Sequence, residues 1–256
     1  MAIADKSRTT AETLSAATIE AYRRQGFVHV PGVISRDEAE HYRAVASGLA
    51  ERIHSHHQGT VFTQLVNVWP QDDEMKQLTF HPNIAAIAER LAGVPLRLWH
   101  DQVLIKAPHK STPTEFHQDQ PYWPHANSTH PLSAWIALVD VPVERGCMTF
   151  LPGSHTHTEL GATDITDAGG VFGACPDFAW FPRVTVPLRA GDCTFHHARC
   201  VHGATPNLTD EPRVAHVVIF MDATATYNGK KHVVTDPLGL TPGQPFDAPY
   251  FPRVNE

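Results

Sequence analysis

Residues 96–107 read LRLWHDQVLIKA, and from here the chain changes from helical patterns to strand patterns. Further apolar or alternating runs, separated by Pro, Gly and Asn turns, occupy 132–141, 147–151, 184–188, 193–197 and 213–223. Many short strands joined by such turns are typical of an antiparallel sandwich or jelly roll. The second half of the chain therefore predicts a mainly β body.

The residues before this point predict helices. The spacing of apolar residues favours a helix over 16–25 that ends at Gly26. Ser35 and Glu38 can form a capping box that opens a helix of about 18 residues. The remaining early elements are a helix over 83–91 and short strands over 27–30 and 61–69. Helices first and strands later indicate an α+β chain whose N-terminal helices pack against one sheet.

A chain of 256 residues is long enough for one well-buried domain. We expect a single domain over 1–256, with a helical part at about 12–93, a jelly-roll core at about 95–223 and an irregular surface tail at 224–256. The stretch 154–182 combines glycines with aromatic residues, which suits either a mobile lid or an ordinary surface loop.

Composition limits the partners of the chain. No run of apolar residues is long enough to cross a membrane, and the first 16 residues lack the apolar core of a secretory signal, so a cytoplasmic location is expected. The net charge is −7 and basic residues are scattered, which argues against a nucleic-acid partner. Four separated cysteines without C-x-x-C spacing are expected to be reduced. Monomer and homodimer both stay open.

A His and a carboxylate stand two residues apart in the segment 114–123, TEFHQDQPYW. If the segment is extended, His117 and Asp119 project to the same face. A second histidine from a distant segment would complete a 2-His-1-carboxylate triad, the arrangement that suits non-haem Fe(II) oxygenases. We expect His202 as that ligand, in preference to His196 or His197, because Gly203 follows it and permits close approach. The histidines that follow the early helix, His54, His56 and His57, are not expected to bind metal.

Arg213 begins an otherwise apolar run, VAHVVIF at 214–220. A buried arginine is costly unless a carboxylate meets it, and its planar fork suits bidentate capture of that carboxylate. A surface salt bridge is the alternative. With the triad present, the preferred interpretation is that Arg213 anchors the distal carboxylate of a 2-oxo acid that chelates the metal.

Several motifs in order resemble the phytanoyl-CoA dioxygenase family of Fe(II)/2-oxoglutarate oxygenases. They are HQDQ-YW at 117–123, LSAWIAL at 132–138, GCM at 146–148 with LPGSH at 151–155, Gly191-Asp192, His202-Gly203 and Arg213. The resemblance implies a double-stranded β-helix, iron held by His117, Asp119 and His202, and 2-oxoglutarate bound by Arg213, with O2 as the oxidant.

The same resemblance implies that Trp135 and a residue near Gln102 lie against the co-substrate. Relatives often carry Ser two positions after the distal histidine, where this chain has Ala204. A hydrogen bond to the co-substrate is therefore expected either to be absent or to come from Thr205 or Thr149. Because halogenating relatives replace the carboxylate ligand and this chain retains Asp119, hydroxylation or a related oxidation is expected. As in other 2-oxoglutarate oxygenases, the resemblance implies release of succinate and CO2.

Two alternatives remain open. A cupin-like zinc or manganese hydrolase or isomerase could use the same three ligands, but would leave Arg213 unexplained. A non-catalytic binding module would turn over no 2-oxoglutarate. For an oxygenase the substrate is a small-molecule metabolite that the sequence does not identify, with contacts expected from Tyr122, Trp123 and the stretch 154–182.

Overall fold

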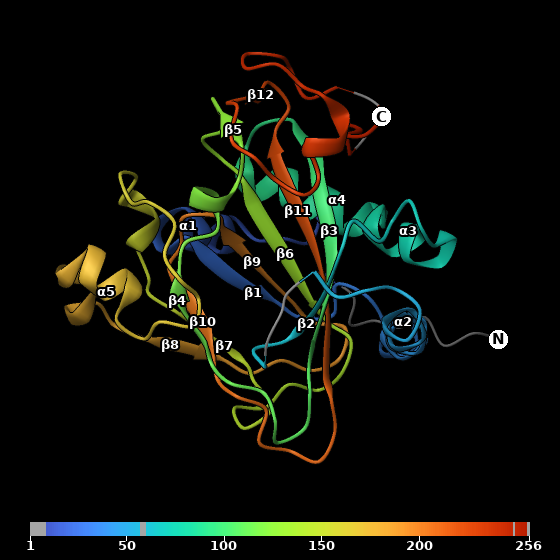
Figure 1. Cartoon of the computed structure of the whole chain (residues 1–256). Helices are drawn as coiled ribbons and strands as arrows, with labels where there is room; N and C mark the ends of the chain where they lie inside the picture. Colours follow the sequence, from blue (N-terminus) through green and yellow to red (C-terminus); the bar gives the residue numbers. More distant parts are fainter. Residues whose placement is uncertain (1–8, 57–59, 248, 255–256) are drawn as a thin grey trace.

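Two antiparallel β-sheets form the body of the chain (Figure 1). The computed structural model describes residues 9–56, 60–247 and 249–254. The larger sheet has the strand order β1-β9-β6-β11-β3-β2 and the smaller one β4-β10-β7-β8. The bounds of the larger sheet are Phe27–Val30 for β1, Thr63–Val66 for β2, Leu96–Lys106 for β3, Leu132–Ala137 for β6, Cys193–His197 for β9 and Arg213–Asp222 for β11. Those of the smaller are Thr114–His117 for β4, Met148–Phe150 for β7, Val184–Val186 for β8 and His202–Ala204 for β10. The expected mixture of helices and antiparallel strands is confirmed.

Three of the four N-terminal helices lie where the sequence predicts them: α1 at Ala16–Gln25, α2 at Arg36–Ala50 and α4 at Pro82–Ala92. Gly26 ends α1 with a φ of 82°, a conformation in which glycine carries no steric penalty. The capping box of Ser35 and Glu38 is present, and α2 has 15 residues. The helix α3 at Asp73–Thr79 was not predicted, because seven residues show little periodicity. Its only sequence signal is Asp72, whose side chain caps it.

Helices α2 and α3 lie to the right of the larger sheet in Figure 1, α4 lies behind its upper part, and the smaller sheet lies to its left. One hydrophobic cluster joins the helices to the sheet face that they cover, with Ile87 and Leu91 of α4 in the same core as Ala134, Val218 and Phe220. Because successive strand residues point to opposite faces, the alternate residues are left to face the smaller sheet. That second face forms the wall of a cavity.

The stretch 154–182 contains more regular structure than expected. A short helix, α5, occupies Gly170–Ala174, and single 3₁₀ turns lie at Ser154–Thr156 and Pro176–Trp180. Phe178 is buried against Val171 and Leu151, so an apolar anchor of its own holds the stretch to the body. The stretch is therefore partly helical, where its sequence suggested only a loop or a lid.

The C-terminal tail was predicted to lie on the surface without a regular element, and this is wrong. Strand β12 at Thr226–Tyr227 pairs with β5 at His125–Ala126, and a 3₁₀ turn follows at Asp236–Leu238. Phe246 and Phe251, each 1% exposed, pack with ring centroids 5.4 and 5.5 Å from that of Trp99. The free energy gained by burying two large aromatic side chains outweighs the conformational entropy lost when this otherwise irregular segment is ordered.

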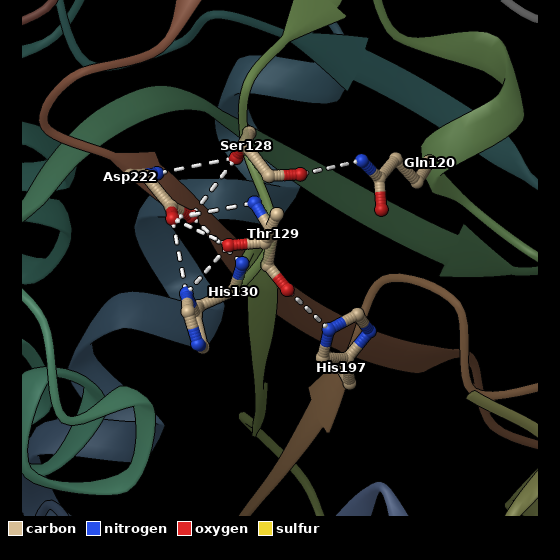
Figure 2. A network of polar contacts seen from close by, with 6 residues as sticks. All are labelled: Gln120, Ser128, Thr129, His130, His197 and Asp222. Carbon is tan, nitrogen blue, oxygen red and sulfur yellow. Dashed lines mark hydrogen bonds and ion pairs between the residues drawn. The ribbon is translucent and has the colours of Figure 1, made fainter. Parts of the chain in front are cut away.

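Asp222, at the end of β11, fixes the loop 128–130 (Figure 2). Its carboxylate accepts hydrogen bonds from the Ser128 hydroxyl at 3.1 Å, the Thr129 amide at 3.2 Å and the His130 amide at 2.8 Å. Backbone carbonyls of the same loop accept hydrogen bonds from the side chains of Gln120, at 2.8 Å, and His197, at 3.1 Å. The network connects β11 and β9 to the turn that carries Asp119.

His197 provides a test of the buried polar network. Burial lowers the pKa of His197 to about 4, although its hydrogen bond to the Thr129 carbonyl acts in the opposite direction. The unfolded histidine has a pKa near 6.5, so between about pH 6.5 and pH 4 the unfolded chain binds a proton that the folded chain does not. The free energy of unfolding should therefore fall as the pH falls through this window.

In His197→Asn we expect that fall to be shallower by at most about 1.4 kcal/mol per pH unit, as urea unfolding of the metal-free protein between pH 7 and pH 4.5 would measure. Between pH 7 and pH 8 the side chain at position 197 is uncharged in both the wild-type protein and the variant, so the stability of the two proteins should show the same pH dependence. Equal slopes below pH 6.5 would contradict the assignment.

Candidate metal centre

His117 and Asp119 converge, but not for the reason that the sequence suggests. Strand β4 ends at His117, and Asp119 has helical backbone angles, φ −75° and ψ −46°, ahead of a 3₁₀ turn at Gln120–Tyr122. The amides of Asp119 and Gln120 both donate to the carbonyl of Ala198, at 2.8 and 3.0 Å. This turn swings the carboxylate back over the end of the strand, so the expectation of one continuous extended segment is corrected.

His202 comes to the same point from β10, where it pairs directly with His117 across the two strands. The ring centroids of His117 and His202 are 4.5 Å apart, and one carboxylate oxygen of Asp119, Oδ1, lies 3.4 Å from Nε2 of His117 and 3.8 Å from Nε2 of His202. Gly203 allows this approach, since a Cβ there would lie 2.9 Å from the Thr114 carbonyl oxygen.

The three side chains fit a metal ion by their chemistry. Nδ1 of His117 donates to the Glu115 carbonyl at 2.7 Å and Nδ1 of His202 donates to the Cys200 carbonyl at 3.0 Å, which leaves both Nε2 atoms as lone-pair donors. One ligand atom from each of His117, Asp119 and His202 lies within 4.8 Å of the others, and among the described residues they are the only such group of His, Cys, Asp and Glu.

Protonation states also suit ligation. Burial lowers the pKa of His202 to about 3, so its imidazole is neutral at neutral pH. Burial alone would raise the pKa of the Asp119 carboxyl, but the neighbouring imidazoles of His202, His117 and His196 outweigh it and hold that pKa well below its usual range. A neutral imidazole and an ionised carboxylate are the forms that bind metal.

The second carboxylate oxygen of Asp119 is held from the other side. Oδ2 accepts a hydrogen bond from the Ser133 hydroxyl at 3.2 Å and lies 3.5 Å from Nε2 of His196. His196 is thus close to the centre but not part of the group of three, whereas His197 turns away to Thr129. Of the three competing histidines, the structure brings His202 to the centre.

The Ser133 contact predicts a measurable effect on metal binding. In Ser133→Ala the carboxylate of Asp119 loses a donor that fixes its rotation, and we expect Co(II) affinity to fall about tenfold, within the range seen for partners of metal ligands. Titration followed by Co(II) absorbance measures it. Ser111→Ala is the matched control, since Ser111 is also buried but its hydroxyl binds the Asn207 amide. Equal affinities in the two variants would contradict the role of Ser133.

The metal centre opens into a cavity of about 640 Å³ between the two sheets. Alternate residues of the larger sheet form one wall: His100, Gln102 and Leu104 of β3, Ser133 and Trp135 of β6, His196 of β9 and Arg213, Val217 and Ile219 of β11. The expected substrate contacts Tyr122 and Trp123 line it too, and from the stretch 154–182 come Ala162 and Ile165. The Tyr122 hydroxyl donates to the carbonyl of Thr163, which joins this stretch to the turn after Asp119.

Arg213 is 2% exposed and lines the cavity. Among the described residues it forms no ion pair and its Nε has no hydrogen-bond partner, while its guanidinium carbon lies 5.1 Å from the ring centroid of Trp135. Burial lowers its pKa to about 9, which still leaves the group charged at neutral pH. A surface salt bridge is therefore excluded, and within the described part of the chain this buried cation faces the cavity without a carboxylate partner.

Of the other residues expected at the co-substrate, two line the cavity and two do not. Trp135 and Gln102 line the cavity, and Gln102 accepts a hydrogen bond from the side chain of Gln64 at 2.6 Å. Thr205 does not lie on the cavity wall, because its hydroxyl donates to the Val143 carbonyl at 2.9 Å. Thr149 is likewise turned to Thr185, at 2.8 Å. The structure thus brings neither threonine to the cavity: Thr149 lies on the outward side of β7, and Thr205 follows the end of β10.

Sequence reasoning missed two groups of lining residues. His56 and Gln64 come from the segment before β3; of the histidines that were set aside, His56 faces the cavity and His57 lies outside the described residues. The second group is Lys230, Lys231, His232 and Val233 of the C-terminal tail. No local signal marks the tail residues as part of a site, because only the docking of the tail brings them there.

The family model described as phytanoyl-CoA dioxygenase matches residues 22–215. The phytanoyl-CoA dioxygenase domain-containing protein 1 of Mus musculus is 29% identical over 160 residues, covering 60% of this chain and 55% of that protein. The chain thus spans about half the length of the curated relatives it matches.

Two solved structures are more similar over their whole length. The non-heme alpha-ketoglutarate-dependent carbocyclase SnoK from nogalamycin biosynthesis is 40% identical, with a TM-score of 0.87 over 96% of this chain and 98% of that one. The epimerase SnoN, in complex with Fe3+, alpha-ketoglutarate and nogalamycin RO, is 43% identical, with a TM-score of 0.81 over 93% and 97%. With the family model matching most of its length, the chain belongs to the phytanoyl-CoA dioxygenase family.

Proposed function

We propose that the protein is an Fe(II)/2-oxoglutarate-dependent oxygenase that oxidises an unactivated C–H bond of a small-molecule metabolite, by hydroxylation or a related oxidation, with release of succinate and CO2. The observation that carries the proposal is Arg213, a buried cation that faces the same cavity as His117, Asp119 and His202 and has no carboxylate partner among the residues that the structure describes. A hydrolase that uses the same three ligands has no need of it.

Each residue has a distinct task in the proposed mechanism. His117, Asp119 and His202 would hold the iron on one side and leave the remaining positions to 2-oxoglutarate and O2. Bound together, these groups supply the oxidising power for C–H cleavage. Arg213 would capture the far carboxylate of 2-oxoglutarate through its planar fork, with Trp135 beneath the guanidinium. Gln102 is placed to donate from its amide, because Gln64 already occupies its carbonyl oxygen.

The remaining walls control the substrate. Tyr122 and Trp123 lie next to the turn that carries Asp119, and they line the cavity beside the metal centre. The apolar surface of such walls excludes water, which keeps the oxidising equivalent for the bound substrate. The two neighbours SnoK and SnoN are a carbocyclase and an epimerase. The placement of the substrate C–H bond, rather than the identity of the metal ligands, would decide whether the reaction is a hydroxylation, a ring closure or an epimerisation.

We also propose that the two facing sheets form a double-stranded β-helix and that residues 1–256 act as a single domain. A six-stranded and a four-stranded antiparallel sheet support this architecture, because the metal centre lies between them. No helix of the described residues is long and apolar enough to span a bilayer.

The proposal is tested by titrating 2-oxoglutarate into Mn(II)-loaded and metal-free protein by calorimetry. We expect one molecule to bind per chain, and binding to depend on the metal. Fe(II)-loaded protein in air should then form succinate from 2-oxoglutarate. Metal-loaded protein that binds no 2-oxoglutarate would reject the proposal in favour of a hydrolase or isomerase.

A further inference from the structure

The cavity has two ends that differ in chemistry. Arg213 pairs with Lys106 at one end of β11, whereas Ile219 pairs with His100, six residues and roughly 20 Å farther along the strand. Ser133, which holds Asp119, pairs with Ile219. The metal centre therefore lies at the level of Ile219 and His100. The side chain of Arg213 reaches back toward it, because its guanidinium carbon lies 5.1 Å from the ring centroid of Trp135, which pairs with Val217. The space between the guanidinium and the metal centre is the part that a small diacid such as 2-oxoglutarate would occupy.

The other end, which we call the tail end, is formed by Trp123, His100 and the tail residues Lys230, Lys231, His232 and Val233. The rings of His100 and His232 have centroids 5.7 Å apart, and Trp123 adds an indole. Nδ1 of His100 donates to the Asp101 carbonyl at 3.1 Å, which leaves Nε2 as an acceptor. Burial lowers the pKa of His100 to about 3 and that of His232 to about 4, so both rings are neutral at neutral pH.

The charge of the cavity lining is opposite in sign to that of the whole protein, and two of its three cations lie at the tail end. The net charge of the chain is −7, but the described lining residues include three cations, Arg213, Lys230 and Lys231, against one carboxylate, Asp119, which belongs to the metal centre. Among the described residues neither Lys230 nor Lys231 forms an ion pair. The ammonium of Lys230 donates to the carbonyl of Pro121, which fixes the tail to the turn after Asp119.

We propose that the tail end binds an aromatic acid, with its ring system against Trp123, His100 and His232 and its carboxylate at Lys230 and Lys231. Planar rings favour stacked or edge contacts with aromatic walls, and an exposed pair of lysines beside them attracts an oxyanion. The acceptor left on His100 suits a hydroxyl on the same ring system. The assignment rests on the proposed function, because 2-oxoglutarate at Arg213 is what leaves the tail end to the substrate.

The test uses three probes with wild-type protein loaded with Mn(II) and 2-oxoglutarate. The probes are 1-hydroxy-2-naphthoate, its methyl ester and coenzyme A, and binding is followed by quenching of tryptophan fluorescence. We expect the acid to bind at least about tenfold more tightly than the ester, which has the same rings without the charge. The double variant Lys230→Gln/Lys231→Gln should lose that preference and leave ester binding unchanged.

A matched double variant, Lys76→Gln/Lys110→Gln, removes two lysines away from the cavity and should keep the preference. Equal binding of acid and ester, or a preference that survives in Lys230→Gln/Lys231→Gln, would overturn the proposal. Tighter binding of coenzyme A than of the naphthoate would also overturn it, in favour of a phosphate-bearing substrate. Calorimetric binding of 2-oxoglutarate to the same samples reports separately on the proposed function, since the lysine substitutions leave the Arg213 end intact.

Discussion

Asp119→Ala is expected to abolish the conversion of 2-oxoglutarate to succinate by the Fe(II)-loaded protein. The substitution removes the only carboxylate among the described lining residues and leaves two imidazoles as the metal site. Loss of a partner that merely orients a ligand costs roughly 10- to 100-fold in metal affinity or activity, so loss of the ligand itself should cost more than 100-fold. Succinate formation by chromatography and Co(II) affinity by absorbance measure the two effects.

The control is Asp140→Ala, which removes a surface carboxylate paired with Arg36 at 2.7 Å and should leave both measurements unchanged. The structure also predicts that the fold survives in Asp119→Ala. The turn is held by the backbone bonds of Asp119 and Gln120 to Ala198, which the substitution does not remove. An alanine variant that still couples substrate oxidation to succinate formation would reject the metal centre as assigned.

Arg213→Met should have two opposite effects, a large loss of 2-oxoglutarate affinity and a gain in stability of the protein without co-substrate. Truncating one partner of a buried, hydrogen-bonded charge pair costs about 2–5 kcal/mol, which is roughly a thirtyfold to several-thousandfold weaker Kd. Calorimetry on Mn(II)-loaded protein measures it. A buried cation without a counter-ion costs several kcal/mol, whereas its stacking on Trp135 returns about 0.5–2 kcal/mol. The free energy of unfolding should therefore rise by about 1 kcal/mol or more.

Lys106→Met is the matched control for Arg213→Met. Lys106 is the cross-strand partner of Arg213 and is fully buried, but it does not line the cavity, and its ammonium donates to the carbonyls of Val61 at 3.1 Å and Thr112 at 2.7 Å. Its loss should lower stability by leaving two carbonyls without a donor, and should leave 2-oxoglutarate affinity unchanged. If Arg213→Met bound 2-oxoglutarate as tightly as Lys106→Met, the anchoring role of Arg213 would be wrong.

Secondary structure in this chain is predictable where the signal is local and long enough. The capping box at Ser35, the stop at Gly26 and the apolar run of β11 each act within a few residues, and each appears at its expected place. The helix α3 was missed because seven residues carry little periodicity. The tail was missed because Phe246 and Phe251 are held by contacts with Trp99, about 150 residues earlier in the chain, which no local pattern reveals.

The candidate site likewise has features that the sequence reveals and features that only the fold reveals. The sequence by itself determined the residue types that chemistry requires, a His-x-Asp pair, a later histidine followed by glycine, and an arginine that begins an apolar strand. Those types follow from what a metal ion and a carboxylate need as partners, so they can be recognised without coordinates.

Only the tertiary structure decided how these residues meet. The turn at Asp119 is made by the Ala198 carbonyl, and the pairing of β4 with β10 sets His202 rather than His197 beside His117. The outward side chain of Thr205 and the arrival of Lys230 and Lys231 at the tail end likewise depend on strand facing and on docking of the tail. Distances between residues far apart in the chain are set by sheet register and by the burial of apolar surface, which are properties of the whole fold.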